Sequence, residues 1–202
     1  MGDVLLKMRN IDKIFPGVKA LSNVDFTLRA GEIHSLMGEN GAGKSTLIKV
    51  LTGVYHRDGG TITLNGKEIS PNNPKEAQEC GISTVYQEVN LCPNLTVAEN
   101  IFIGREPKKF GFIDWKQINK RSADLLNSLN IHIDVTKTLD HYSVAIQQMI
   151  AIARAVDVDA KILILDEPTS SLDEEETKRL FSIIRQLQKK GMGIIFISHF
   201  LE

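Results

Sequence analysis

The chain has 202 residues, enough for one domain with a sizeable hydrophobic core. Lys and Arg number 24 and Asp and Glu 25, so the net charge of -1 gives no whole-chain reason to expect nucleic acid or an anionic membrane as a partner. The two cysteines, Cys80 and Cys92, lack metal-ligand spacing and indicate reduced thiols in a cytosolic protein. No apolar run approaches the roughly 18 residues needed to cross a bilayer, so any membrane association would come through a partner.

Two strands are expected near the N-terminus, over residues 4–14 and 24–30. In the second, residues 25–29 alternate polar and apolar side chains, as a half-buried antiparallel strand does. The turn between the strands, residues 15–18, carries the aromatic ring of Phe15. Two interpretations of this ring stay open: a hydrophobic plug in a loop, or a platform on which a nucleotide base stacks.

A glycine-rich turn follows an expected buried strand, residues 33–37, and leads into a helix that continues to about Leu51. From Gly38 to Ser45 the spacing is G-x-x-x-x-G-K-S, that of a phosphate-binding P-loop. Its glycines allow the left-handed backbone angles that aim several N–H groups into one nest, and the helix start adds its positive dipole end. Lys44 is expected to reach the β- and γ-phosphates, and the Ser45 hydroxyl to hold Mg²⁺. The residues expected to bind nucleotide here are consecutive: Gly38, Glu39, Asn40, Gly41, Ala42, Gly43, Lys44, Ser45 and Thr46.

The next segment adds a hairpin, a short helix and a further strand. Residues 61–67 have a hairpin pattern with Asn65-Gly66 at its turn. A helix is expected over residues 74–79, and residues 81–87 read as a strand that ends on Gln87.

Residues of about 89–160 are expected to form a mostly helical subdomain, inserted into an α/β core of residues 1–88 and 161–202. The first helix of this insertion has Thr96 and Glu99 at the spacing of a capping box.

Further helices of the insertion are expected over residues 114–130 and 143–156, the second with Ser143 as its N-cap. Residues 105–112, before the first of these helices, are basic and aromatic. Trp115 is expected to be a packing anchor rather than a ligand contact.

The last segment returns to a strand, a helix and a strand. Residues 161–168 form an apolar run that contains Asp166 and Glu167 near its end, and such a run fits a parallel strand covered on both faces. Residues 193–199 read as another buried strand. The amphipathic helix expected over residues 174–190 has these apolar positions: Leu180, Phe181, Ile184 and Leu187.

Three of these strands end on polar residues. Parallel strands end at one edge of a sheet, where ligands of open α/β sheets bind, so Gln87, Asp166 and His199 are expected to meet at the phosphate site. Asp166 can face Mg²⁺ through Ser45 and water, and an ionised Glu167 can polarise an attacking water. The alternative is a solvated pair of acids at a strand end.

This set of motifs resembles the ATP-binding cassette (ABC) ATPases over the whole chain, 1–202. The P-loop, Gln87, the Leu-Asp-Glu-Pro-Thr-Ser block at 165–170, the Ser-Ser-Leu-Asp D-loop at 170–173 and His199 occur in the family's order. Some stretches look specifically like the bacterial monosaccharide-importer ATPases, which carry two cassettes in one polypeptide, and this chain resembles the first cassette. Those stretches are residues 15–21, 37–41 and 197–202.

The resemblance implies an α/β fold with a P-loop NTPase (RecA-like) core, an antiparallel β subdomain and an inserted α-helical subdomain. It also implies a sandwich dimer, in which each ATP lies between the P-loop of one cassette and the signature segment of the other. Phe15 would then be the adenine platform, and Glu167 the general base. Gln87 would contact Mg²⁺ and couple to the membrane partner, and His199 would contact the γ-phosphate.

The resemblance further implies an ATPase, with ATP and Mg²⁺ as cofactors, that drives uptake of a monosaccharide. Its partners would be membrane permease subunits, a second cassette and, indirectly, a periplasmic sugar-binding protein, but no nucleic acid. It would lie peripherally on the cytoplasmic face of the inner membrane, with a docking surface near residues 88–112. Two alternatives stay open: a soluble ABC ATPase of DNA repair or translation, which the balanced charge argues against, and an ATP-binding regulatory domain without turnover.

Two features depart from the family pattern. Where the family signature is Leu-Ser-Gly-Gly-Gln, residues 142–146 are Tyr-Ser-Val-Ala-Ile. Ser143 and the helix dipole could still meet a γ-phosphate, but side chains replace both glycines, so we expect a weak or non-hydrolytic site there. Family cassettes also continue beyond the histidine that corresponds to His199. We therefore expect a fragment that binds nucleotide and hydrolyses little of it alone.

Overall fold

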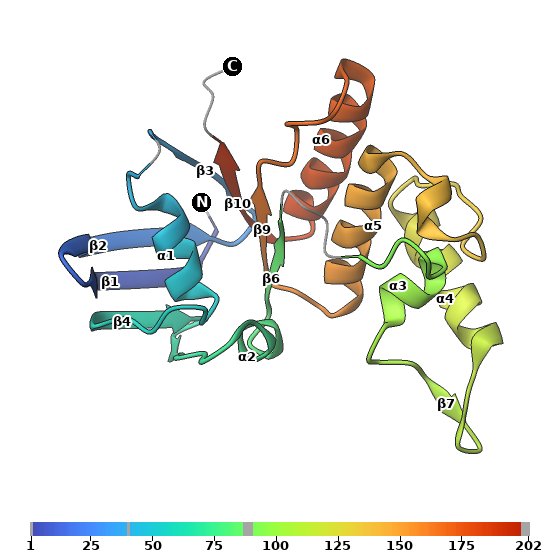
Figure 1. Ribbon diagram of the computed structural model, residues 1–202, viewed down its shortest axis with the longest axis horizontal. Coiled ribbons are helices and arrows are strands. Elements are labelled where there is room, and N and C mark those ends of the chain that lie inside the picture. The colour runs from blue at the N-terminus through green and yellow to red at the C-terminus, as the bar shows by residue number, and fades with distance from the viewer. Residues whose placement is uncertain (1, 40, 87–90, 199–202) are drawn as a thin grey trace. The chain divides into compact units, whose positions relative to one another are not determined.

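In the computed structural model of the chain, the described residues are 2–39, 41–86 and 91–198, and they form two compact units (Figure 1). The first unit comprises the described residues of Met1–Thr84, Ala160–Glu167 and Leu187–Glu202. The second comprises those of Val85–Asp159 and Pro168–Gln186. Residues 168–186, assigned to the core in our sequence-based division, group here with the second unit.

An antiparallel sheet forms one part of the first unit, with the strand order β2-β1-β4-β5. Its strands are β1 (Val4–Phe15), β2 (Val18–Arg29), β4 (Gly59–Leu64) and β5 (Lys67–Glu68). The expected hairpin is confirmed: Leu64 pairs with Lys67 across a two-residue turn in which Asn65 and Gly66 both have positive φ, of 49° and 75°. Asn-Gly is the preferred sequence for this turn, because both positions require the left-handed region.

A parallel sheet forms the other part of the first unit, with the order β3-β10-β9-β6. Its strands are β3 (Ile33–Met37), β10 (Gly193–Ser198), β9 (Ile162–Asp166) and β6 (Ile82–Val85). The apolar residues of β9 and β10 are buried on both faces, which confirms the expectation from their continuous apolar sequence. The helices α1 (Lys44–Leu51) and α2 (Pro74–Glu79) complete this unit, both at the expected positions.

Strand β3, which precedes the P-loop, is less buried than we predicted. Ile33 is 38% exposed and Met37 49% exposed, and exposed residues alternate along the strand. The reason is its place in the sheet, since β3 lies at the edge of the four strands formed by the described residues and pairs there with β10. The apolar run correctly predicted the strand but not its position at an edge.

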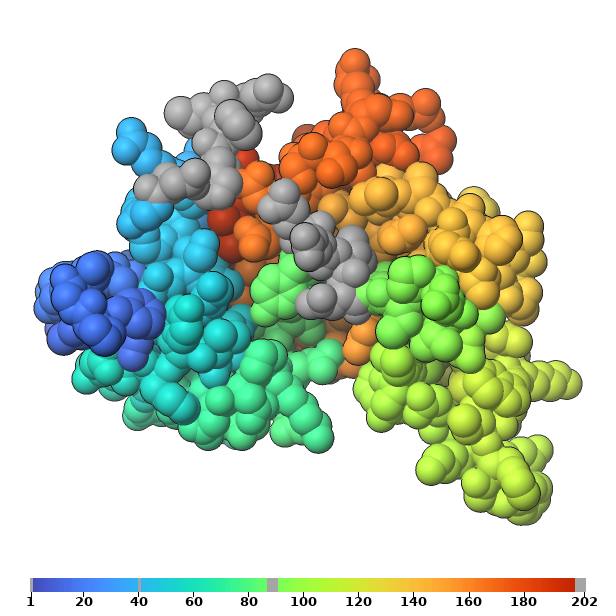
Figure 2. Space-filling model, in the orientation of Figure 1, coloured from blue at the N-terminus to red at the C-terminus, as the bar shows by residue number. Residues whose placement is uncertain are grey.

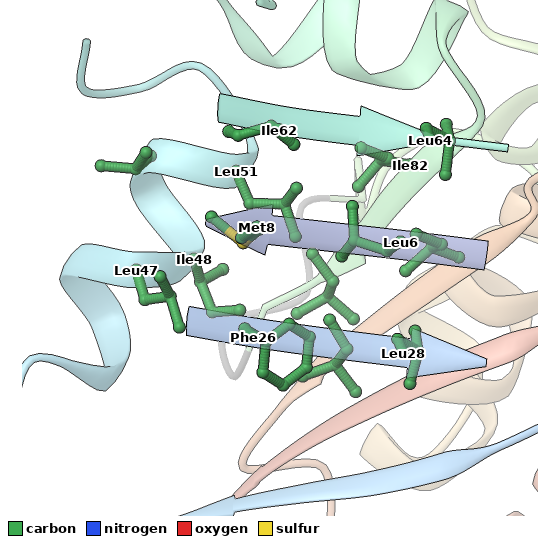
Figure 3. Packing of buried hydrophobic residues seen from close by; sticks show 14 of the residues in the cluster. Leu6, Met8, Phe26, Leu28, Leu47, Ile48, Leu51, Ile62, Leu64 and Ile82 are labelled. Atoms are coloured by element: carbon green, nitrogen blue, oxygen red, sulfur yellow. The ribbon is translucent and has the colours of Figure 1, made fainter. Parts of the chain in front are cut away.

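One hydrophobic cluster joins both sheets of the first unit to helix α1 (Figure 3). Leu47, Ile48 and Leu51 of α1 lie toward the antiparallel sheet, where Met8 and Phe26 belong to the same cluster. The parallel strands contribute isoleucines to it: Ile162, Ile164, Ile195 and Ile197. Burial of apolar surface therefore fixes the helix that follows the P-loop against the strands beneath it.

The second unit is mostly helical. It contains α3 (Val97–Phe102), β7 (Lys108–Lys109), β8 (Phe112–Ile113), α4 (Trp115–Ser128), the short 3₁₀ helix η1 (Leu139–His141), α5 (Val144–Asp157) and most of α6 (Glu174–Lys189). The predicted capping box is present, since Glu99 N donates to Thr96 Oγ1 at 3.1 Å and Thr96 N donates to Glu99 Oε2 at 2.7 Å. In the described part of the chain, no helix has the length and hydrophobicity needed to cross a membrane.

Two large apolar side chains on the helices of this unit are exposed. Trp115 is 49% exposed, because it is the first residue of α4 and directly follows the β7–β8 hairpin, so it is not a buried anchor. Phe181 of α6 is also exposed, whereas Ile183 is buried. The buried stripe of α6 follows the helical repeat through Leu180, Ile184 and Leu187, and position 181 lies beside that stripe rather than on it.

Strand β1 offers a matched test of the core, because it carries one isoleucine inside and one outside. Ile11 is 0% exposed and Ile14 is 56% exposed. We expect Ile11→Ala to lower the free energy of unfolding by about 2–5 kcal/mol, because it leaves a cavity in a close-packed cluster. Ile14→Ala should cost less than about 1 kcal/mol. Urea denaturation of both variants measures the difference, and equal losses would contradict the assigned core.

Candidate functional site

The loop between β3 and α1 has the backbone that a phosphate nest requires. Gly38, Gly41 and Gly43 all have positive φ, of 147°, 86° and 85°. Gly43 is the N-cap of α1, and a Cβ atom added there would lie 3.1 Å from Ala20 O and from a Leu21 methyl carbon. A larger residue at position 43 would therefore meet both an unfavourable φ and a close neighbour. Asn40, also expected in this nest, lies outside the described residues.

Lys44 begins α1 and is buried apart from 8% of its surface. Its ammonium group donates to the carbonyl oxygen of Gly38 and, at 3.0 Å, to that of Glu39. The positive charge is thus held over the loop itself, where a bound phosphate would meet it. Ser45 is exposed on the first turn of the helix and Thr46 is half-buried.

The acids at the end of β9 share one sheet edge with this loop. Ile197 of β10 pairs with Leu36 of β3 on one side and with Asp166 of β9 on the other. Because the three strands are parallel and paired in this register, their carboxyl ends lie at the same edge of the sheet. Asp166 is the last residue of β9, and the P-loop begins directly after β3 at that edge. This register agrees with the expected place of Asp166 near the P-loop, and the convergence on a phosphate site stays a prediction. Gln87 and His199, predicted at the same edge, lie outside the described residues.

Glu167 has a constrained backbone. Its N–H donates to Ile197 O at 3.0 Å, and its φ is 49°, in the left-handed region. Non-glycine residues seldom adopt this conformation, and such strained positions cluster at functional sites. The backbone thus holds the candidate general base directly after Asp166, in a turn that a free strand end would not adopt.

The chemistry of this edge fits Mg²⁺ held together with phosphate. Ser45 supplies a hydroxyl oxygen and Asp166 a carboxylate, and both lie at the carboxyl end of the parallel sheet. The described residues contain no cluster of three or more His, Cys, Asp or Glu that could hold a metal alone. This composition suits Mg²⁺, which protein sites usually bind through one or two carboxylates plus substrate phosphates and water.

Phe15, at the end of β1, packs against a second aromatic ring. The edge of one ring meets the face of the other between Phe15 and Tyr55, with centroids 5.1 Å apart and planes at 76°. Lys13 Nζ lies 5.4 Å from the centroid of the Phe15 ring. Sequence reasoning missed Tyr55, since a single tyrosine after a helix carries no spacing signal. The packing contact agrees with a loop plug, but the half-buried ring keeps surface for stacking.

Asp58 holds the end of β1 that carries Phe15. Its carboxylate accepts a hydrogen bond from Ile14 N at 2.6 Å and forms an ion pair with Lys13 at 3.2 Å. The hydrogen bond from Ile14 first, and that from Lys13 second, lower the pKa of Asp58 below its usual value. Like any ordinary aspartate, Asp58 is ionised at neutral pH, and its two contacts hold the strand end in place.

Ser143 is the N-cap of α5, as predicted, and accepts a hydrogen bond from Ile146 N at 3.4 Å. Its hydroxyl also donates to Glu176 Oε1 at 3.2 Å. Val144 beside it is 48% exposed, so an apolar side chain stands at the start of this helix. The serine is thus present but already has an anionic partner.

Glu176 also caps the start of α6. Glu176 N donates to Asp173 Oδ1 at 2.8 Å, and Asp173 N donates to Glu176 Oε2 at 3.3 Å, which together form a capping box. One carboxylate therefore connects the end of the Ser-Ser-Leu-Asp segment to Ser143. Sequence reasoning missed Glu176, although its spacing from Asp173 is the capping-box signal.

Residues 21–170 match the protein family described as ABC transporter. The chain belongs to this family. Among curated relatives, a galactofuranose transporter ATP-binding protein of Escherichia coli K12 is 58% identical over 198 residues, covering 98% of this chain and 40% of that protein. A ribose import ATP-binding protein of Geobacillus kaustophilus is 50% identical over 200 residues, covering 98% and 40%. The chain thus spans about two fifths of the length of these relatives.

Solved ABC cassettes have the same fold. An ATP-binding cassette of an ABC transporter in its ADP conformation superposes with a TM-score of 0.86 at 27% identity, covering 98% of this chain and 82% of that one. A nucleotide-free cassette gives 0.85 at 26% identity, covering 97% and 81%. The resemblance and the fold class stated from the sequence are therefore confirmed, and ATP is the nucleotide that this family's cassette binds.

The contacts of Lys44 lead to a test of nucleotide binding by the cassette. We expect Lys44→Met to weaken ATP binding by about 10- to 100-fold, the range that corresponds to the loss of a charge-assisted hydrogen bond to phosphate. Lys75→Met on α2, also a lysine on a helix of the first unit, is the control and should leave Kd unchanged. Isothermal titration with ATP measures both, and an unchanged Kd in Lys44→Met would contradict the assignment.

Proposed function

We propose that this chain is the ATP-binding and ATP-hydrolysing part of a longer protein that powers the import of a monosaccharide across the cytoplasmic membrane. The observation that carries this proposal is the shared edge of the parallel sheet, where the P-loop, Asp166 and Glu167 follow level strand ends. The relatives support sugar as the cargo, because they are named as galactofuranose and ribose import proteins.

In this proposal, residues of the P-loop and of the strand ends each have a role in ATP hydrolysis. The N–H groups of the P-loop and the ammonium of Lys44 bind the β- and γ-phosphates. Ser45 and Asp166, with Gln87, hold Mg²⁺, which when bound neutralises phosphate charge. Glu167 accepts the proton of the attacking water as general base.

Two further residues contact the nucleotide in this proposal. Phe15 stacks on the adenine, with Tyr55 supporting the ring from its side. His199 contacts the γ-phosphate. Both roles come from the family resemblance.

The partners in this proposal follow from the family and from the relatives, which are named as import ATP-binding or transporter ATP-binding proteins. A second cassette completes a sandwich dimer with this one, and permease subunits in the membrane carry the sugar. A periplasmic sugar-binding protein delivers the cargo and does not touch this chain. The cassette then lies peripherally on the cytoplasmic face of the inner membrane.

The two composite sites of that dimer are unequal in our proposal. The site that uses this chain's P-loop and Glu167 hydrolyses ATP. The site that uses Ser143 binds ATP weakly, because Val144 and Ala145 replace glycines and because Glu176 already accepts a hydrogen bond from the serine hydroxyl. A carboxylate beside the expected γ-phosphate also repels it.

A second candidate function is an ATP-binding regulatory domain without turnover. The altered segment at residues 142–146 favours it, because side chains stand where backbone would approach a phosphate. Measurement of ATP hydrolysis by the full-length protein separates the two candidates.

The general base gives the direct test of the proposed reaction. We expect Glu167→Gln to lower kcat of the full-length protein by about 100-fold or more, since the amide cannot accept a proton, with ATP still bound. Glu79→Gln, an exposed glutamate at the end of α2, is the matched control. Substantial residual turnover in Glu167→Gln would refute the assigned base, and no turnover in the parent protein with its permease would favour the regulatory function.

The weak site has its own test. We expect Glu176→Gln to tighten ATP binding at that site, because it removes a negative charge next to the Ser143 hydroxyl while keeping an oxygen that can accept its hydrogen bond. Glu174→Gln, in the same exposed first turn of α6, is the control. Titration of the full-length protein with an ATP analogue resolves the weaker site. Equal tightening in both variants would indicate a general charge effect and contradict a specific role of Glu176.

A further inference from the structure

The β7–β8 hairpin exposes more aromatic surface than any packing role explains. Phe110 is 91% exposed and Phe112 80% exposed, and they are separated only by Gly111. Ile113 and Trp115 add further exposed apolar surface directly after them. We call residues 107–115 the aromatic hairpin. Within the second unit it projects beyond α3 and α4, and its side chains form the yellow-green knob at the lower right of the space-filling view (Figures 1 and 2).

The tip of the aromatic hairpin places phenylalanine where turn chemistry disfavours it. Lys109 pairs with Phe112 across a two-residue turn, in which Phe110 has a φ of 52° and Gly111 a φ of 86°. Such a turn prefers Asn-Gly, since a bulky residue is strained in the left-handed region. The sequence therefore accepts local strain to present an aromatic ring at the most exposed point of the hairpin, which points to a functional contact.

The base of the aromatic hairpin is held firmly. Asp114 N donates to Pro107 O at 2.9 Å across the two strands. Asp157 of α5, whose side chain is only 9% exposed, forms ion pairs with Arg105 at 2.6 Å and with Arg121 of α4 at 3.0 Å. The aromatic pair is therefore carried on a short rigid support rather than on a loose loop.

The charge around the aromatic hairpin is positive even though Asp157 pairs with Arg105 and Arg121, whereas the whole chain has a net charge of -1. Two acids, Glu106 and Asp114, lie within residues 104–121. The six cationic residues of that segment are Arg105, Lys108, Lys109, Lys116, Lys120 and Arg121. The four lysines among them are exposed, and Lys109 Nζ lies 5.8 Å from the centroid of the Phe110 ring.

We propose that the aromatic hairpin binds the surface of an anionic phospholipid bilayer. Phe110 and Phe112 enter the boundary of the acyl region, and the lysines meet the phosphate headgroups, the two contributions that add up in interfacial binding. A protein partner fits less well, because the centres of protein interfaces are depleted in lysine, whereas here lysines surround the aromatic rings. This contact is independent of ATP turnover and stands whether or not the proposed transport function holds.

Vesicle binding by the purified full-length protein tests the proposal. The probes are vesicles of phosphatidylcholine alone and of phosphatidylcholine mixed with phosphatidylglycerol, separated from free protein by sedimentation. We expect the parent protein to bind the anionic vesicles, less so in high salt, and to bind the neutral ones poorly. Phe110→Asn with Phe112→Thr should reduce the partition coefficient at least about tenfold while relieving strain in the turn.

Charge variants complete the experiment. Lys108→Gln with Lys109→Gln should weaken binding to anionic vesicles by about tenfold, given the attraction of each lysine to an anionic surface. Lys189→Gln with Lys190→Gln, two adjacent exposed lysines elsewhere in the chain, should not. Circular dichroism and ATP titration check that each variant is folded.

Three outcomes would overturn the proposal. One is a parent protein that ignores anionic vesicles, and another is equal binding to neutral and anionic vesicles. The third is a double phenylalanine variant that binds as the parent does. If the parent ignores vesicles while the phenylalanine variant loses its permease subunits in detergent, the aromatic hairpin is a protein contact instead.

Discussion

The register of three parallel strands determines where the candidate site lies. Backbone hydrogen bonds set Ile197 level with Leu36 on one side and with Asp166 on the other. The P-loop and the acids Asp166 and Glu167 therefore lie at the same edge of the sheet. Backbone pairing alone brings them there, without a side-chain contact between them. Because the buried apolar run of β9 lies between Lys161 and Asp166, a shift of that strand along its neighbours would move one of these charged residues toward the core. The core thus protects the alignment on which the proposed site depends.

Two of the seven non-glycine residues with positive φ in the described part of the chain lie at places to which we assign function. They are Glu167, the candidate base, and Phe110, at the tip of the aromatic hairpin, whereas the other five are Asn or Asp residues, which tolerate this region. Strain of this kind persists only where the surrounding structure enforces it, as Ile197 O does for Glu167. Charge is also distributed unevenly along the chain. The net charge of the whole chain is near zero, but residues 104–121 are basic, so the whole-chain charge is a poor guide to local partners.

Local signals predicted most of the fold, and contacts between distant residues limited the rest. The apolar runs of β9 and β10, the capping box at Thr96 and the P-loop spacing are short-range patterns, and the structure confirms their elements. The exposure of β3 depends on its neighbours in the sheet, which periodicity does not encode. The link from Ser143 to Glu176 spans 33 positions, so no spacing could reveal it. The roles of Gln87 and His199 stay predictions.

The two carboxylate oxygens of Glu176 accept different hydrogen bonds. Oε2 accepts from the backbone of Asp173 and completes the cap of α6, whereas Oε1 accepts from the Ser143 hydroxyl. If that hydroxyl turns to a phosphate, only the second of these bonds is lost. The exchange of partners at one helix start therefore leaves the other helix start intact. Release of the Ser143 hydroxyl would therefore cost its hydrogen bond to Glu176, in agreement with the weak site that we propose, and would leave the cap of α6 in place.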